Sequence, residues 1–491
     1  ALMPFWSPDS RHIGFFTETQ MKRVNVASGV VDVLCDVKRA RGGTWNRADQ
    51  ILFAPGSDGG LDLISATGGD VRHITTLDHA HGETGHRFPS FLPDGKHFLF
   101  SVLPPQAGRF PIDIGSIDSP NRERLCAASS AVLYAPPDRV LFLRGTTLVA
   151  QRFDPATRRL SGDPMPLREA VAGTNFSGSA GFSVSDDGVL AYATYKTTRT
   201  RVVWTDLEGR ETQRLSFPPA PYGSVGLSPD DHRAVFQVWD DSHMASLWIG
   251  DLERGTATRF SEEPQMCENA RWSPDGTRIA YFISQLGPQT IVVRPTDGSG
   301  PARTYLADDP VFKDLCGWTS DGKGLVVARQ DPATRFDLWV VPVDGGGKPW
   351  KYLATPFNES GASMSPDGRW MSYLSDESGR NEIYVQSYPT PGSRYQVTTM
   401  GGLGAGWSRA GDVLLWGEEG SLLGTIMAAD VLPGVSFRLG PPRPWARLPR
   451  DQVSFDVAHA QKRLLVLLPE GRPQPNSITV VVNWPAALTA E

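Results

Sequence analysis

One motif recurs from end to end of this chain: an aromatic or bulky residue, then Ser-Pro-Asp-Gly or a variant of it, then an alternating apolar run. The clearest copies begin at Trp6, Phe91, Leu227, Trp272, Trp318 and Met364, and weaker ones at Trp45, Tyr134, Phe182, Trp407 and Phe455. Successive copies are 39 to 48 residues apart, close to the period of about 40–50 residues that is typical of a β-propeller blade. The repeat therefore predicts an all-β fold.

A single repeat has the chemistry of a four-stranded antiparallel blade. In the repeat at Trp272, residues 270–273, 278–283, 289–294 and 302–306 alternate in the way that strands do. Proline presets φ in the first turn, aspartate caps that turn through its side chain, and glycine accepts a positive φ. Each sheet leaves apolar faces that a neighbouring sheet must cover, so stacking into a ring is expected.

Eleven copies exceed the four to eight blades of one ring, so we expect two tandem propellers. A polar stretch near residues 195–205 suggests the boundary, which gives residues 1–198 and 199–491 as the two domains. The first is expected to have five or six blades and the second six. We expect the last blade to use residues 454–457, 463–468 and 477–483, with 211–217 supplying its outer strand.

Composition excludes several classes of protein. The chain has 48 Lys and Arg residues against 54 Asp and Glu residues and a net charge of −6, so the basic patch of a nucleic-acid binder is not expected. The longest apolar runs, 464–468 and 478–482, are far shorter than the ~20 residues of a membrane helix. The chain opens without an initiator Met or a signal-peptide pattern, so we expect a processed chain or an excised piece. Four isolated cysteines predict no metal ribbon, and no cofactor is expected.

The repeats resemble a known family, the TolB-like, WD-repeat-like propeller region of bacterial membrane-anchored serine/threonine kinases. The resemblance is carried by Pro4-Phe-Trp-Ser-Pro-Asp-Ser10, Gly43-Thr-Trp-Asn-Arg47, Gly82-Glu-Thr-Gly-His-Arg87, Phe91-Leu-Pro-Asp-Gly-Lys-His97, Ser375-Asp-Glu-Ser-Gly-Arg380 and residues 478–484. It implies a bacterial, extracytoplasmic (periplasmic or cell-surface) sensing or protein-binding region, ordinarily with two six-bladed rings.

Motifs of two related enzyme classes are missing. The sequence has no kinase Gly-rich loop, His-Arg-Asp or Asp-Phe-Gly motif, and no Gly-x-Ser-x-Gly elbow of the kind that a peptidase hydrolase domain carries. The chain is therefore not expected to phosphorylate a substrate or to cleave one through a serine nucleophile.

Candidate ligand-binding residues come from the loops that enter the innermost strands, because these loops should converge at the channel mouth of each ring. In the first ring, the residues four and five positions before a motif copy include Arg41, His86 and Arg87. In the second ring they include Tyr222, Glu268, Lys313, Asp314 and Glu359. A basic first mouth suits an anion, an acidic second mouth suits a cation, and solvated loop ends without a ligand are the alternative.

The loop at residues 79–87 is the strongest local signal, because it holds three of the nine histidines. A metal site formed by His81, Glu83 and His86 is a weak hypothesis, since their order does not match the His-Glu-x-x-His motif. We favour a hydrogen-bonding loop that orients His86 and Arg87. The turn at residues 376–381 similarly favours a hairpin over a calcium site.

Three functions remain open from the sequence. We favour a noncatalytic ligand-sensing or protein-binding module of a receptor-like protein, whose ligand is a small molecule, an oligosaccharide or a protein. The alternative is a carbohydrate-active enzyme, a polysaccharide lyase or glycosidase, with Glu268, Asp314 and Glu359 as candidate catalytic carboxylates. The third is a structural scaffold that assembles partners on its outer blade faces.

Overall fold

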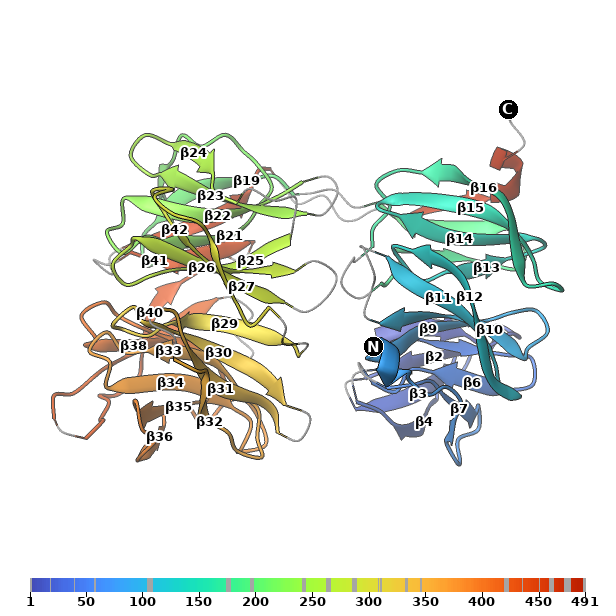
Figure 1. The fold of residues 1–491 in the computed structure, drawn as a ribbon, viewed down its shortest axis with the longest axis horizontal. Helices are drawn as coiled ribbons and strands as arrows, with labels where there is room; N and C mark the ends of the chain where they lie inside the picture. Colours follow the sequence, from blue (N-terminus) through green and yellow to red (C-terminus); the bar gives the residue numbers. More distant parts are fainter. Residues whose placement is uncertain are drawn as a thin grey trace. The chain divides into compact units, whose positions relative to one another are not determined.

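The fold is all-β, as the repeat predicts (Figure 1). The structure, a computed structural model, describes residues 2–17, 19–38, 40–56, 59–103, 109–173, 178–194, 198–240, 244–261, 266–284, 289–307, 309, 311–331, 334–344, 347–418, 424–434, 436–449, 451–458, 463–471 and 478–488. Within these residues the strands form eleven antiparallel sheets, accompanied by the 3₁₀ helices η1 (His79–His81) and η2 (Trp484–Leu488). Neither of these helices has the length and apolar character that a bilayer crossing needs.

Every copy of the motif lies on the strand at one end of a sheet. These first strands are β1 (Leu2–Trp6), β5 (Gly43–Trp45), β9 (Gly85–Phe91), β13 (Leu133–Ala135), β17 (Phe182–Val184), β21 (Tyr222–Leu227), β25 (Met266–Trp272), β29 (Lys313–Trp318), β33 (Glu359–Met364), β37 (Gly402–Trp407) and β41 (Ser454–Val457). First strands of successive sheets lie against one another in both halves of the chain. The first strands are therefore the inner strands of the blades.

The Ser-Pro-Asp-Gly turn closes each hairpin through side-chain hydrogen bonds. Ser273 Oγ donates to Asp275 Oδ1 at 2.6 Å and accepts from the backbone N–H of Arg278 at 2.9 Å. Gly276 has a φ of +69°, which a residue with a Cβ rarely adopts. The guanidinium of Arg278 lies 4.9 Å from the ring centroid of Trp318, on the next sheet. The motif thus defines a turn and also a contact between blades.

The chain forms two compact units. The N-terminal unit comprises residues 1–196 and 475–491, and the C-terminal unit comprises residues 197–474. The further strands of the N-terminal unit are β2 (His12–Phe16), β3 (Gln20–Asn25), β4 (Val31–Asp36), β6 (Gln50–Phe53), β7 (Asp62–Ser65), β8 (Arg72–His73), β10 (His97–Leu103), β11 (Phe110–Ser116), β12 (Ser119–Ala128), β14 (Arg139–Arg144), β15 (Thr147–Asp154), β16 (Arg159–Arg168), β18 (Val189–Ala193) and β43 (Ile478–Val482).

The described C-terminal unit holds six four-stranded sheets and the N-terminal unit five sheets. The further strands of the C-terminal unit are β19 (Thr200–Thr205), β20 (Glu211–Arg214), β22 (Arg233–Trp239), β23 (Ala245–Asp251), β24 (Thr256–Arg259), β26 (Arg278–Ser284), β27 (Thr290–Pro295), β28 (Arg303–Tyr305), β30 (Gly324–Asp331), β31 (Arg335–Pro342), β32 (Trp350–Leu353), β34 (Trp370–Ser375), β35 (Glu382–Ser387), β36 (Arg394–Gln396), β38 (Val413–Glu418), β39 (Thr425–Asp430), β40 (Arg443–Arg447) and β42 (Leu464–Pro469).

The last strand of the chain lies in a different sheet from the one predicted. Residues 477–483 were expected in the final blade, but β43 pairs with β18 of the N-terminal unit, with Ala191 opposite Val480. The final blade is completed by β19 and β20 instead, in the order β20-β19-β42-β41. Outer strand β20 falls within the expected segment 211–217, whereas β19 was not expected in this blade. The proposed boundary segment 195–205 includes residues 195–197, which lie outside the described residues.

Apolar clusters lie between neighbouring sheets rather than inside any one of them. In the described C-terminal unit, six such clusters join the six sheets in sequence, and one of them joins the closing sheet to β21–β24. In the described N-terminal unit, four clusters join the five sheets. Trp484, from η2, is buried in the last of these, beside Leu190 and Tyr192 of β18. Figure 1 shows the red C-terminal segment beside β16.

Candidate functional site

A solvent-open pocket of about 340 Å³ lies over the sheet β9–β12 of the N-terminal unit. We call it the Arg122 pocket; it is lined by Asp78, His81, Glu83, Val102, Leu103, Pro111, Asp113, Arg122 and Arg124. Its residues come from the loop that joins β8 to β9 and from strands β10, β11 and β12. Three apolar and six polar or charged residues thus share one concavity. Small-molecule sites are ordinarily lined mostly by apolar side chains, so this pocket favours a charged ligand over an apolar one.

The loop between β8 and β9 is held by its own side chains. Asp78 caps η1 by accepting a hydrogen bond from the backbone N–H of His81, and Gly82 ends the turn with a φ of +77°. Asp78 Oδ2 also lies 2.7 Å from His81 Nδ1. Glu83 Oε2 accepts from the backbone N–H of Asp78 at 2.8 Å. These bonds place Glu83 toward the sheet.

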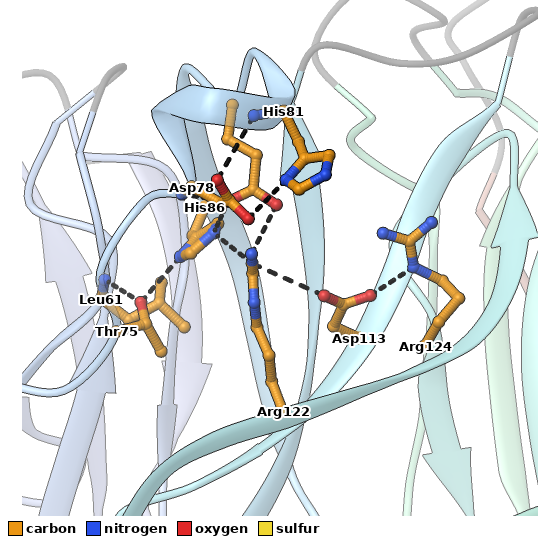
Figure 2. A network of polar contacts seen from close by, with 9 residues as sticks. Leu61, Thr75, Asp78, His81, His86, Asp113, Arg122 and Arg124 are labelled. Atoms are coloured by element: carbon orange, nitrogen blue, oxygen red, sulfur yellow. Dashed lines mark hydrogen bonds and ion pairs between the residues drawn. The ribbon is translucent and has the colours of Figure 1, made fainter.

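Arg122 connects this loop to the outermost strand of the sheet (Figure 2). Its Nη2 donates to Glu83 Oε1 at 2.6 Å, and its Nη1 lies 3.0 Å from His86 Nε2. On the other side, Nη1 is 3.5 Å from Asp113 Oδ2, and Asp113 Oδ1 accepts from Nε of Arg124. The network therefore crosses the sheet from β9 to β12.

His86 is buried at the inner end of this network. Its Nε2 lies 3.0 Å from Arg122 Nη1, which can only donate, and 3.2 Å from Glu83 Oε2, which as a carboxylate can only accept. Its Nδ1 lies 2.8 Å from Thr75 Oγ1, and that hydroxyl oxygen accepts from the backbone N–H of Leu61. Burial is the main cause that lowers the pKa of His86, to about 4, so the imidazole is neutral near pH 7.

Glu83 stays ionised despite being largely buried. Burial acts to raise its pKa, but the hydrogen bonds from Arg122 and the Asp78 backbone, together with the charge of Arg122, hold that pKa below its usual value. The side chain of Arg122 is 23% exposed and that of Arg124 is 50% exposed. The guanidinium of Arg122 is thus occupied mainly by contacts within the protein, whereas Arg124 also presents N–H groups to solvent.

The sequence analysis identified the loop at residues 79–87 but not the pocket residues of strands β11 and β12. The predicted residues Glu83 and His86 meet in the network, and His81 lines the pocket. Asp113, Arg122 and Arg124 were missed, because charged residues on an outer strand resemble an ordinary solvated edge. The signal that was available is the spacing of Arg122 and Arg124, two apart and therefore on one face of β12.

The predicted side chains five positions before a motif copy lie in the protein interior. His86, Tyr222, Lys313 and Glu359 are all buried. Alternate residues of an inner strand point into the interface between sheets, which accounts for this burial. The position of these residues at the channel mouth stays a prediction, and so does their ligand-binding role.

Two of the buried predicted residues of the second ring bond to backbone carbonyls of the protein. Tyr222 donates from its hydroxyl to the Pro218 carbonyl at 3.0 Å. Lys313 Nζ donates to the carbonyls of Asp309 at 2.6 Å and Val311 at 2.9 Å, and burial lowers its pKa. Both residues therefore hold the ends of their own strands.

The three carboxylates proposed for an enzyme have different surroundings. Glu359 accepts a hydrogen bond from Thr355 Oγ1, and burial raises its pKa to about 7. Asp314 accepts from Asn269 Nδ2 at 2.5 Å, and burial raises its pKa as well. Glu268 lies half-buried on β25. The first two carboxylates are thus each bonded to a different neighbour.

The remaining predicted positions are accounted for as follows. Arg41 and Arg87 are half-buried near the starts of β5 and β9. Among the described residues, no group of three or more His, Cys, Asp or Glu side chains is arranged to hold a metal ion. Asp376, in the turn between β34 and β35, accepts from the backbone N–H of Asn358 and pairs with Arg335.

Comparisons with known proteins support the fold type. Residues 177–388 match the family model described as the TolB beta propeller domain. A tricorn protease homolog from Streptomyces coelicolor is 30% identical over 134 residues, which are 27% of this chain and 12% of that protein. Mouse prolyl endopeptidase FAP is 26% identical over 211 residues, which are 40% of this chain and 25% of that protein. The chain therefore matches only a minor part of the curated relatives.

A solved structure of TolB from Acinetobacter baumannii is 13% identical, with a TM-score of 0.37, and the match covers 70% of this chain and 80% of that one. The antiparallel four-stranded sheets are those of a β-propeller, and residues 177–388 are similar to the TolB beta propeller domain.

Proposed function

We propose that this chain is a noncatalytic binding module, and that the Arg122 pocket is its binding site for a short peptide segment or a similar small ligand that carries both charges. The observation that carries the proposal is the network from Glu83 through Arg122 to Asp113, which fixes the charged wall of the pocket before any ligand arrives. A site that is ordered in advance loses less entropy on binding.

The pocket offers two exposed charges of opposite sign. Arg124, half exposed, presents N–H groups that suit a carboxylate, and Asp78, 41% exposed, presents oxygens that suit an ammonium group. Val102, Leu103 and Pro111 supply apolar surface. A short peptide with both termini free and small apolar side chains matches this combination, whereas a simple inorganic anion uses only part of it.

We further propose an extracytoplasmic location in a bacterium and a receptor-like setting. The support is the resemblance of the repeats to the propeller regions of membrane-anchored kinases. Under this proposal, binding at the pocket is the sensing event, and catalysis belongs to another part of the system.

The alternative of a carbohydrate-active enzyme has weaker support. Raised pKa values at Asp314 and Glu359 are what a general acid requires. A glycosidase, however, needs two carboxylates that face one sugar bond, and Glu359 is 1% exposed and bonded to Thr355.

The test is a thermal-shift titration with trialanine, N-acetylated trialanine and C-amidated trialanine. The proposal predicts that free trialanine stabilises the protein, by about 2.7 kcal/mol at 100 times its Kd. Each blocked peptide should stabilise less, and the variants Arg124→Ala and Asp78→Asn should lose the corresponding part of the shift. Arg303→Ala, an exposed arginine on β28, is the matched control. Equal shifts with all three peptides, or no shift, would refute the assignment.

A further inference from the structure

The sheet that ends the N-terminal unit differs from the others in its number of strands. In the described part of the chain, ten sheets have four strands, whereas the sheet β17-β18-β43 has three. Strand β43 therefore forms an edge at the position where the other sheets carry one more strand. Its outward N–H and C=O groups form a ready template for another strand.

The sequence of β43 also differs from that of every other outermost strand. Each of the outer strands β4, β8, β12, β16, β20, β24, β28, β32, β36 and β40 contains at least one charged residue. Charged side chains on an edge are a common device against pairing with a second chain. Strand β43 reads Ile-Thr-Val-Val-Val, with no charge and no proline. It has the composition of a strand with neighbours on both sides.

One face of β43 is exposed and entirely apolar. Ile478, Val480 and Val482 are 71%, 58% and 76% exposed, whereas Val481 packs against the cluster that holds Trp484. These three side chains continue the row that Val189, Ala191 and Ala193 begin on β18. Adding a strand at this edge would therefore extend both the hydrogen-bond ladder and an apolar row.

We propose that β43 pairs with β43 of a second copy of this chain, antiparallel and across a two-fold axis at Val480. A two-fold interface brings the same surface of each copy together, so the strand must complement itself. In this register Ile478 lies opposite Val482 of the other copy, Val480 lies opposite its equivalent, and Thr479 lies opposite Val481. All five residues are β-branched, and such pairs are favourable across strands. The two sheets then become one six-stranded sheet.

Sedimentation equilibrium of the full chain over a range of micromolar concentrations tests this pairing. The wild-type protein should approach twice the mass of one chain as its concentration rises. Val480→Lys places two like charges opposite each other and should weaken association by about tenfold or more, and Val480→Glu should do the same. Val33→Lys, at an exposed valine on the charged edge strand β4, is the control and should associate as the wild type does.

Mixing the two charged variants gives the decisive comparison. Val480→Lys and Val480→Glu mixed in equal amounts should associate more strongly than either variant alone, because the two-fold register sets opposite charges against each other. Thermal unfolding of each variant establishes that it is folded. A wild-type chain that stays monomeric, or a mixture that associates no better than the separate variants, would overturn the proposal; the former outcome would point to a different polypeptide at this edge.

Discussion

Arg122 Nη2 donates to Glu83 Oε1 at 2.6 Å, and this contact joins the outermost strand of a blade to the loop before its innermost strand. The two residues are 39 positions apart. Hydrogen bonds within the loop shape it, and the ion pair ties it to the far edge of the sheet, so that both together give the pocket a fixed wall. Several measurable consequences depend on this relationship.

Replacing Arg122 by alanine should destabilise the N-terminal unit. The change leaves Glu83, 9% exposed, and Asp113, 5% exposed, without their shared cation. Removing one partner of a largely buried pair should cost about 2–3 kcal/mol. The urea unfolding midpoint of the N-terminal unit measures the loss. Arg124→Ala removes a half-exposed partner and should cost under about 1 kcal/mol; equal losses for the two variants would argue against this account.

Glu359 should make stability depend on pH in one direction. Because burial raises its folded pKa from 4.5 to about 7, the folded state holds a proton that the unfolded state releases between these values. The contribution is fully present below pH 4.5 and is lost as the pH rises to about 7. Glu359→Gln should remove this decline, which amounts to about 3 kcal/mol. Unfolding free energies measured from pH 4.5 to 8 check the prediction, and parallel curves for the two proteins would contradict it.

Trp484 should stabilise the N-terminal unit although it lies near the other end of the chain. It is 2% exposed among Leu190 and Tyr192 of β18, so Trp484→Ala should cost about 3–5 kcal/mol in that unit. Hydrogen exchange is the measurement, with faster exchange expected in β18 and unchanged exchange in β22. Faster exchange in β22 instead would contradict the packing of Trp484 in the N-terminal unit.

Ser273 should contribute more to stability than an exposed serine. It is fully buried, and its Oγ satisfies the backbone N–H of Arg278. Ser273→Ala removes this acceptor and should cost about 1–3 kcal/mol. Thermal unfolding compares it with Ser299→Ala, at an exposed turn position where little change is expected. Equal losses of stability in the two variants would contradict the stabilising role assigned to Ser273 in the turn.

The parts of the fold that sequence predicted are those determined locally. The turn at Ser273 forms from residues within five positions of each other, so the inner strands and their hairpins could be recognised from the repeat. The pairing of β43 with β18 joins residues nearly three hundred positions apart, and no local pattern encodes it. An uncharged strand at 478–482 fits either sheet by its composition alone.

The candidate site was likewise predictable only where a local sequence pattern marks it. The histidine-rich loop was visible as an unusual local composition, and it does line the pocket. Its partner Arg122 comes from the charged run Arg122-Glu123-Arg124 on an outer strand, which by composition resembles any exposed edge. Only the folded sheet brings Asp113 beside both Arg122 and Arg124.

The central claim is that the Arg122 pocket binds a ligand through the exposed part of Arg124. Isothermal titration of trialanine into the wild-type protein, Arg124→Ala and the control Arg303→Ala tests it most directly. The account predicts saturable one-to-one binding to the wild type and to Arg303→Ala, with affinity about tenfold lower for Arg124→Ala, which corresponds to ~1.4 kcal/mol. Equal affinity for all three proteins, or no binding to the wild type, would contradict it.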